Sequence, residues 1–184
     1  MSDPTPPAPP FRIRPFRSAD LPRLQEITAA TFGPVSIDKN MDDLLGPFGH
    51  GGWRGRKLAA ITGDCAAQPD GVFVAEDPAD PSGRPLGYVT TRLDVAGGLG
   101  WIPNVAVDPA HQGRGLGRAL LEYALDFFRR RGMQVAKIET LEQNPVGQAL
   151  YPSLGFQEVA RQIHYAMRLE GPAAEKRLPT NSHE

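Results

Sequence analysis

Three glycines and two arginines stand close together in the middle of the chain. They are Gly113, Gly115 and Gly117, with Arg114 and Arg118 between and beside them. Because glycine has no Cβ, a bulky anion can approach the main chain closely at these positions. A helix is expected to begin here, and the first amides of a helix lack intrahelical partners and lie at the positive end of its dipole. Together with the two guanidinium groups, they predict a site for phosphate, with pyrophosphate as the best fit.

Two common phosphate-binding motifs do not fit this stretch. A GxxxxGKS/T loop requires lysine followed by serine or threonine, whereas Arg118 and Ala119 stand there. The dinucleotide pattern GxGxxG requires a third glycine, but its two candidate positions hold Arg118 and Leu120. The spacing that is present reads Gln-x-x-Gly-x-Gly from Gln112 to Gly117, after the strand-like run VAV and Asp-Pro. The stretch therefore predicts a strand, a glycine-rich turn and a helix.

A second stretch, NPVGQALYPSLGF from Asn144 to Phe156, also carries residues that could do chemistry. Asn144 is a good helix N-cap with Pro145 at the first helical position, and Gly155 ends a short helix. Capping and packing explain most of these residues. They do not explain Tyr151, a phenol near the end of that helix, which we expect to face the crevice opened by the glycine-rich loop. An amphipathic core tyrosine is the alternative interpretation.

The two stretches together resemble the two signatures of the GNAT superfamily of acyl-CoA-dependent N-acyltransferases. In that family the Gln-x-x-Gly-x-Gly loop holds the coenzyme A pyrophosphate through main-chain amides. Asparagine, tyrosine seven residues later, and then Leu-Gly-Phe form the second signature. The resemblance implies an acetyltransferase that uses acetyl-CoA as cosubstrate and transfers the acetyl group to a primary amine by direct attack. A glycine turn that only packs helix on strand is the alternative, and the second motif weakens it.

The resemblance also implies roles for individual residues. A main-chain amide around Val105 or Ala106 would polarise the thioester carbonyl. Asn144 would hydrogen-bond the pantetheine arm, and Tyr151 would protonate the coenzyme A thiolate as general acid. The coenzyme A site would comprise Val105, Ala106, Val107, Gln112, Gly113, Arg114, Gly115, Gly117, Arg118 and Asn144.

A base is expected beside the thioester, because an amine must lose its proton before or during attack. Glu139 is the first candidate, on the expected strand beside the cleft, where acids serve some members of the superfamily, often through water. Since side chains alternate along a strand, either Ile138 or Glu139 must face away from the main core. Glu142 is the second candidate. A solvated or arginine-paired carboxylate explains Glu139 equally well, and a water chain without a single base stays open.

The elements around these motifs predict an α/β (α+β) fold with a mixed, mostly antiparallel sheet of about six to seven strands, flanked by about four helices. Alternating patterns predict strands at 11–16, 72–76, 86–94, 99–107, 135–141 and 159–169. Helical spacing predicts helices at 18–32, 37–45 and 116–131, and a less determined one over 53–68. Joining 99–107 to 135–141 through one helix requires a parallel, right-handed crossover. The resemblance implies that this parallel pair splays apart around the acyl-pantetheine.

One residue of the strand 99–107 predicts a local irregularity. Pro103 cannot donate to a sheet ladder, which indicates a break in regular pairing just before Asn104. The resemblance implies a bulge in this strand, whose free main-chain groups pair with the pantetheine arm.

Length and composition indicate one ordinary domain, placed at 11–169, between a proline-rich tail at 1–10 and a polar tail at 170–184 that we expect to be disordered. The net charge of −1 gives no reason to expect nucleic acid as a partner. Cys65 is the one cysteine, so no internal disulfide is expected. No signal-like or membrane-spanning run is present, and no metal-ligand spacing, so we expect a cytoplasmic protein without membrane contact or metal.

The acceptor is not determined by these motifs. A small-molecule amine and a protein amino group fit equally well, and a homodimer stays open. In the superfamily the region after the first strand lines the acceptor site, which makes His50, Trp53 and Arg54 candidate contacts. A lid or packing element with solvated arginines is the favoured interpretation of that region. Two other classes also remain: an acyl-CoA-binding regulatory module without turnover, and a nucleotide-binding protein without acyl chemistry.

Overall fold

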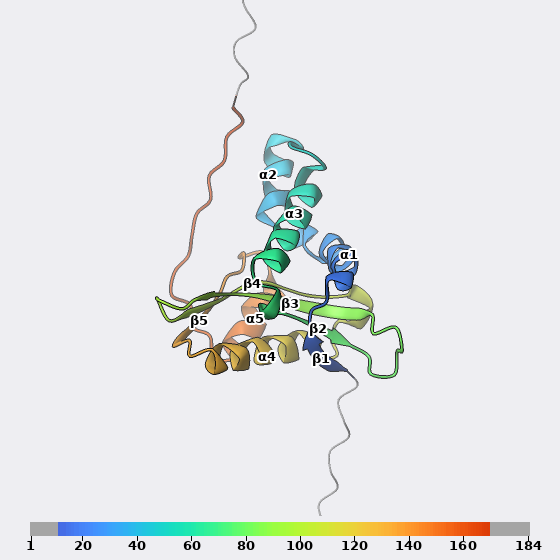
Figure 1. Cartoon of the computed structure of the whole chain (residues 1–184). Coiled ribbons are helices and arrows are strands. Elements are labelled where there is room, and N and C mark those ends of the chain that lie inside the picture. Colours follow the sequence, from blue (N-terminus) through green and yellow to red (C-terminus); the bar gives the residue numbers. More distant parts are fainter. Residues whose placement is uncertain (1–10, 170–184) are drawn as a thin grey trace, which may run out of the picture.

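Five strands form one mixed sheet in the computed structural model, which describes residues 11–169 (Figure 1). The expected tails at 1–10 and 170–184 lie outside these residues. In spatial order the strands are β1 (Arg12–Pro15), β2 (Val72–Glu76), β3 (Pro85–Asp94), β4 (Leu99–Val107) and β5 (Val135–Ile138). The pairs from β1 to β4 are antiparallel, whereas β4 and β5 run parallel. The predicted mixed sheet is confirmed, with five strands in the described range instead of six to seven.

Helices cover both faces of the sheet (Figure 1). On one face α1 (Leu21–Thr31) and α3 (Gly52–Ala67) pack against β2, β3 and β4, and α2 (Ile37–Leu45) packs on α3. On the other face lie α4 (Leu116–Arg130) and α5 (Pro145–Ser153). Each face has its own apolar cluster, because alternate strand residues point to opposite sides. Among residues 11–169, no helix is long and apolar enough to cross a bilayer.

A bulge interrupts β4 where Pro103 predicts one. Thr90 of β3 pairs with Asn104, but two residues later Arg92 pairs with Trp101, so β4 holds one extra residue between the two pairs. The extra residue lets Asn104 face the α3 side of the sheet, as Trp101 does, and sends Val105 to the α4 side. The bulge thus changes which side chains of β4 face α3 and which face α4.

The parallel pair is short and open at one end. Its last paired residues are Ile102 of β4 and Ile138 of β5, whereas β4 continues from Pro103 to Val107. Within the described residues, this second half of β4 is paired with β3 on one side only. The main-chain groups on its other side are therefore available to a ligand, as the implied splay requires.

Two expected strand ranges are wrong. Residues 159–169 form no strand, although their apolar side chains alternate, and Val159, Ile163, Tyr165, Met167 and Leu169 are exposed. The contacts of this segment lie elsewhere: Arg161 pairs with Glu142, and Arg168 donates to the carbonyls of Leu45 and Gly46 at the end of α2. The expected strand 135–141 ends at Ile138, so Glu139 lies just outside it.

Candidate functional site

The loop after β4 is anchored at its first residue. Asp108 accepts a hydrogen bond from the amide of Ala110 at 2.8 Å, which starts the short 3-10 helix Pro109–His111. Arg23 of α1 also donates to the Asp108 carboxylate. Burial alone would raise the pKa of Asp108, but the Ala110 amide and the Arg23 charge hold it below its usual value. A charged Asp108 therefore fixes the loop relative to α1.

Two of the three glycines, Gly113 and Gly115, serve the backbone conformation of the loop. Gly113 and Gly115 have φ values of +74° and +84°, and an added Cβ at either position would meet no other heavy atom within 4 Å. At Gly117 an added Cβ would make ordinary contacts, 3.8 Å from Leu150 and Val107. Gly115 is the N-cap of α4, and no side chain caps this helix end. No side chain in the described part of the chain therefore accepts from the first amides of α4, so an anion can accept from them.

Two of the polar side chains at the loop, Gln112 and Arg118, donate hydrogen bonds within the protein. Gln112 donates to the carbonyl of Val107 at 3.0 Å and so ties the loop to the end of β4. Arg118 donates to the hydroxyl of Ser153 at 2.6 Å, which links α4 to the last turn of α5. Arg114 is exposed. The structure therefore brings the predicted phosphate ligands to one end of α4, with Gln112 and Arg118 already engaged in local contacts.

Helix α5 is built around Asn144 and Gly147. The Asn144 side chain accepts from the amide of Gly147 at 3.1 Å and donates to Thr140 at 2.9 Å, so it caps the helix. A Cβ at Gly147 would lie 2.8 Å from the side-chain nitrogen of Asn144, 2.8 Å from the hydroxyl of Thr140 and 3.2 Å from the ring of Tyr151. Glycine is therefore required here for the cap and for the position of the tyrosine. Capping accounts for Asn144 in this structure, and its contact with pantetheine stays a prediction.

Tyr151 packs into the apolar cluster on the α4 side of the sheet. The same cluster holds Val105 and Val107 of the open half of β4, and Ile138 at the end of β5. Its ring meets the edge of Phe156. Burial raises the pKa of Tyr151 above its ordinary value of 10.0, so the phenol keeps its proton at neutral pH. The structure thus places a protonated phenol in the layer that lines the open edge of β4.

The two candidate bases are solvated and paired with cations. Glu139 lies just after β5, with its side chain 54% exposed and 2.8 Å from the ammonium of Lys137. Glu142 is more exposed and contacts Arg161 at 3.2 Å. The pairing that sequence alone allowed as the alternative is therefore present, with lysine in place of arginine for Glu139.

A polar network on the α3 side was missed by the sequence analysis. The ammonium of Lys57 in α3 donates to Asn104 at 2.7 Å, and Asn104 donates to the carboxylate of Asp64 at 2.6 Å. Burial lowers the pKa of Lys57, which also lies 4.1 Å from the centre of the Phe32 ring. Since Asn104 directly precedes Val105, the network reaches the open half of β4. The available signal was a lysine within the otherwise apolar stripe of α3.

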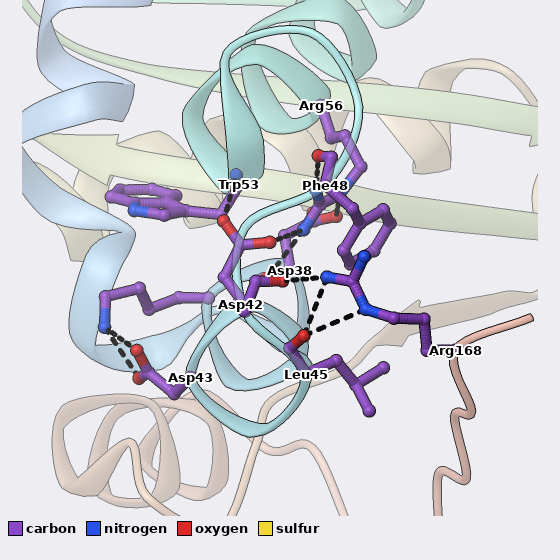
Figure 2. Close-up of polar contacts among 10 residues, drawn as sticks. Asp38, Asp42, Asp43, Leu45, Phe48, Trp53, Arg56 and Arg168 are labelled. Carbon is purple, nitrogen blue, oxygen red and sulfur yellow. Dashed lines mark hydrogen bonds and ion pairs between the residues drawn. The ribbon is translucent and has the colours of Figure 1, made fainter. Parts of the chain in front are cut away.

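The N-terminus of α3 is held by α2 (Figure 2). Asp42 accepts from the main-chain amide of Trp53 at 2.6 Å and from Arg56 at 2.8 Å, and Arg56 also pairs with Asp38. This network orients Trp53 toward a cavity of about 490 Å³ that Trp53 and Arg54 line. His50 is exposed and does not line this cavity. Two of the three candidate acceptor contacts are therefore brought together.

The structure offers no metal centre within residues 11–169, where no group of three or more histidine, cysteine, aspartate or glutamate side chains could hold an ion.

Comparison with known proteins agrees with this geometry. The family model described as "Acetyltransferase (GNAT) family" matches residues 38–156, more than half of the chain. Mycothiol acetyltransferase of Tsukamurella paurometabola is 37% identical over 123 residues, which are 63% of this chain and 41% of that protein. The ribosomal protein bS18-alanine N-acetyltransferase of Escherichia coli is 43% identical over 68 residues, 37% of this chain and 46% of that protein. The chain thus spans less than half the length of these curated relatives.

A similar fold is found among solved structures. Rv2747 from Mycobacterium tuberculosis, crystallised in complex with CoA, superposes with a TM-score of 0.59 at 24% identity. The match covers 84% of this chain and 76% of that one. At this identity the likeness establishes the fold.

Proposed function

The chain belongs to the acetyltransferase (GNAT) family, and we propose that it transfers the acetyl group of acetyl-CoA to a primary amine by direct attack. One observation carries the proposal. The open edge of β4, from Pro103 to Val107, leads through a glycine loop into the uncapped N-terminus of α4. The strand edge offers both N–H and C=O groups and the helix end offers N–H groups, which suits a ligand that has an amide-bearing arm at one end and a pyrophosphate at the other.

In this proposal the pyrophosphate binds the first amides of α4 and the loop around Gly113 and Gly115. Arg114 is exposed and supplies positive charge beside it. The pantetheine arm lies along the open half of β4, and the amide of Val105 or Ala106 donates to the thioester carbonyl. That hydrogen bond strengthens as negative charge develops on the carbonyl oxygen during attack, which stabilises the transition state.

Tyr151 is proposed as the general acid. The amine nitrogen forms a bond to the acyl carbon, and the carbon–sulfur bond breaks with its electron pair on sulfur. The phenol gives its proton to this sulfur, and the amine gives up its own proton to Glu139 through water, with Glu142 as the alternative base. Tyr151 lies in the same apolar cluster as Val105 and Val107 of the open half of β4, which supports this role.

Substitution of the phenol tests the mechanism. Tyr151→Phe keeps the ring and its packing, so we expect kcat to fall by roughly 100-fold to 10,000-fold, while the Kd of acetyl-CoA changes less than twofold. Thiol release measures kcat and calorimetry measures Kd. Tyr165→Phe is the matched control, because Tyr165 is 89% exposed in the C-terminal segment. A Tyr151→Phe enzyme with wild-type kcat would refute the general-acid role.

A second candidate is an acyl-CoA-binding module without turnover. The solvated, paired state of Glu139 and Glu142 favours it, because neither carboxylate is held as a buried base. The same assays separate the two functions: a module binds acetyl-CoA but releases no thiol with any amine. Small-molecule and protein acceptors are both represented among the relatives, whose names mention mycothiol and a ribosomal protein alanine.

A further inference from the structure

The cavity beside Trp53 is closed on one side by the loop between β5 and α5. Gln143 donates to the carbonyl of Pro34 at 2.8 Å. It also exchanges two hydrogen bonds of 3.0 Å with the side-chain amide of Asn40 in α2. The loop that leads into α5 is thus fixed against the end of α1 and against α2. Since Gln143 directly precedes Asn144, this wall of the cavity continues into the helix that carries Tyr151.

Helix α3 connects the cavity with β4. Trp53 is buried at the start of α3, and Lys57 lies one helical turn further along the same helix. Lys57 donates to Asn104, the residue before Val105. One turn of helix rises about 5.4 Å, so Trp53, which lines the cavity, lies one turn along α3 from the residue that contacts β4.

The charges around the cavity are balanced except for one. Lys39 lies 2.5 Å from Asp43, so those two lining groups neutralise each other. Arg56, just outside the cavity, is engaged by Asp38 and Asp42, as Figure 2 shows. Arg54 is exposed and lies over the Trp53 ring, 4.9 Å from its centre.

Arg54 has no anionic partner among residues 11–169. The indole face holds the planar guanidinium in place without neutralising it. A guanidinium fixed in this way presents two parallel N–H donors, the geometry that a carboxylate accepts. The cavity thus offers an apolar indole wall and one uncompensated cation.

We propose that the acceptor is a small amine with a carboxylate at its opposite end, and that Arg54 binds this carboxylate. The inference rests on the proposed function and adds the acceptor class to it. The cavity volume of about 490 Å³ suits an acceptor the size of an ω-amino acid or a dipeptide. The carboxylate lies over Trp53, and the amine lies one turn along α3, beside the open half of β4.

Glycylleucine and its uncharged analogue glycylleucinamide test the proposal as a matched pair. We expect the KM of the dipeptide to be at least tenfold lower than that of the amide. Arg54→Gln should raise the KM of the dipeptide at least tenfold, leave the KM of the amide unchanged, and change kcat less than twofold. Arg129→Gln is the control, because Arg129 is exposed and pairs with Asp126 on α4. Equal KM values, or an equal effect of Arg54→Gln on both acceptors, would overturn the proposal.

A binding measurement separates this inference from the proposed function. The protein saturated with CoA is titrated calorimetrically with each of the two peptides, which requires no turnover. If no thiol is released from acetyl-CoA but the dipeptide still binds at least tenfold tighter than the amide, and Arg54→Gln removes this difference, the acetyl-transfer function fails and the carboxylate site stands. If thiol is released but neither measurement distinguishes the two peptides, the carboxylate site fails and acetyl transfer stands.

Discussion

Replacement of Gly115 by alanine tests the predicted pyrophosphate site, because its effect on acetyl-CoA affinity can be separated from its effect on protein stability. Gly115 has a φ of +84° and open space around an added Cβ. Placing an L-residue in this left-handed conformation costs roughly 1–2 kcal/mol. Alanine also lowers the conformational entropy of the unfolded chain, which stabilises the folded protein by about 0.4–1 kcal/mol and offsets part of this cost. The net loss in the free energy of unfolding is therefore about 1 kcal/mol, or a fall of about 2–4 °C in Tm.

Gly132 provides a matched control at the other end of the same helix. Its φ is +75°, and an added Cβ there also meets no atom within 4 Å. Gly132→Ala should therefore lose the same stability as Gly115→Ala. The two variants differ in which helix end they affect. Gly115 precedes the uncapped N-terminus of α4, where the pyrophosphate is proposed to bind, and Gly132 follows the C-terminus.

The affinity for acetyl-CoA should separate the two variants. A methyl group at position 115 keeps the pyrophosphate away from the first amides of α4, and each lost charge-assisted hydrogen bond costs about 1.5–3 kcal/mol. Since about 1.4 kcal/mol is a factor of ten, the Kd should rise at least tenfold for Gly115→Ala and less than twofold for Gly132→Ala. Calorimetric titration measures both. An unchanged Kd for Gly115→Ala, or an equal rise for both variants, would refute the pyrophosphate assignment.

Two further predictions concern stability. Burial opposes ionisation of Asp20 and Glu76, but Arg14 lowers the pKa of both, so their stabilising contribution is present above about pH 4.3 and is lost as pH falls through the lowered values. Arg14→Met should cost about 3–5 kcal/mol at pH 7 and gain stability on acidification, and urea unfolding with the same pH dependence as wild type would contradict this. Gly100→Ala should cost about 1–3 kcal/mol, because its Cβ would lie 2.5 Å from the Phe128 ring. Adding Phe128→Leu should restore part of the lost Tm, whereas additive losses would exclude this clash.

Local patterns predicted most elements of the fold. Helix α2 has the predicted bounds 37–45, strand β2 matches 72–76, and β4 matches 99–107. The chemistry of proline was sufficient to place the bulge near Pro103, since a missing N–H disrupts pairing whatever the partner is. These predictions succeeded because each depends on neighbouring residues alone.

The parallel pairing of 99–107 with 135–141 is confirmed, because a single crossover helix restricts how two strands can pair, but other predictions that needed a partner failed. The alternation in 159–169 indicates which side chains share a face, but it does not specify a neighbouring strand, and the segment is held at α2 by Arg168 instead. The contact between Lys57 and Asn104 joins residues 47 positions apart, and the lysine in the apolar stripe of α3 does not by itself indicate its partner. The glycine loop could be predicted as a candidate site because its conformation and its chemistry are both local.

The open half of β4 also affects how the empty protein behaves in solution. Unpaired main-chain groups at a sheet edge pair readily with a strand from another molecule. The stretch from Pro103 to Val107 is not covered by β5. Pro103 limits its extension at one end, since it offers no N–H to an incoming chain. In the proposed binding mode, acetyl-CoA and a second polypeptide compete for the same main-chain groups, so the proposed cosubstrate is expected to protect the protein against aggregation during purification and storage.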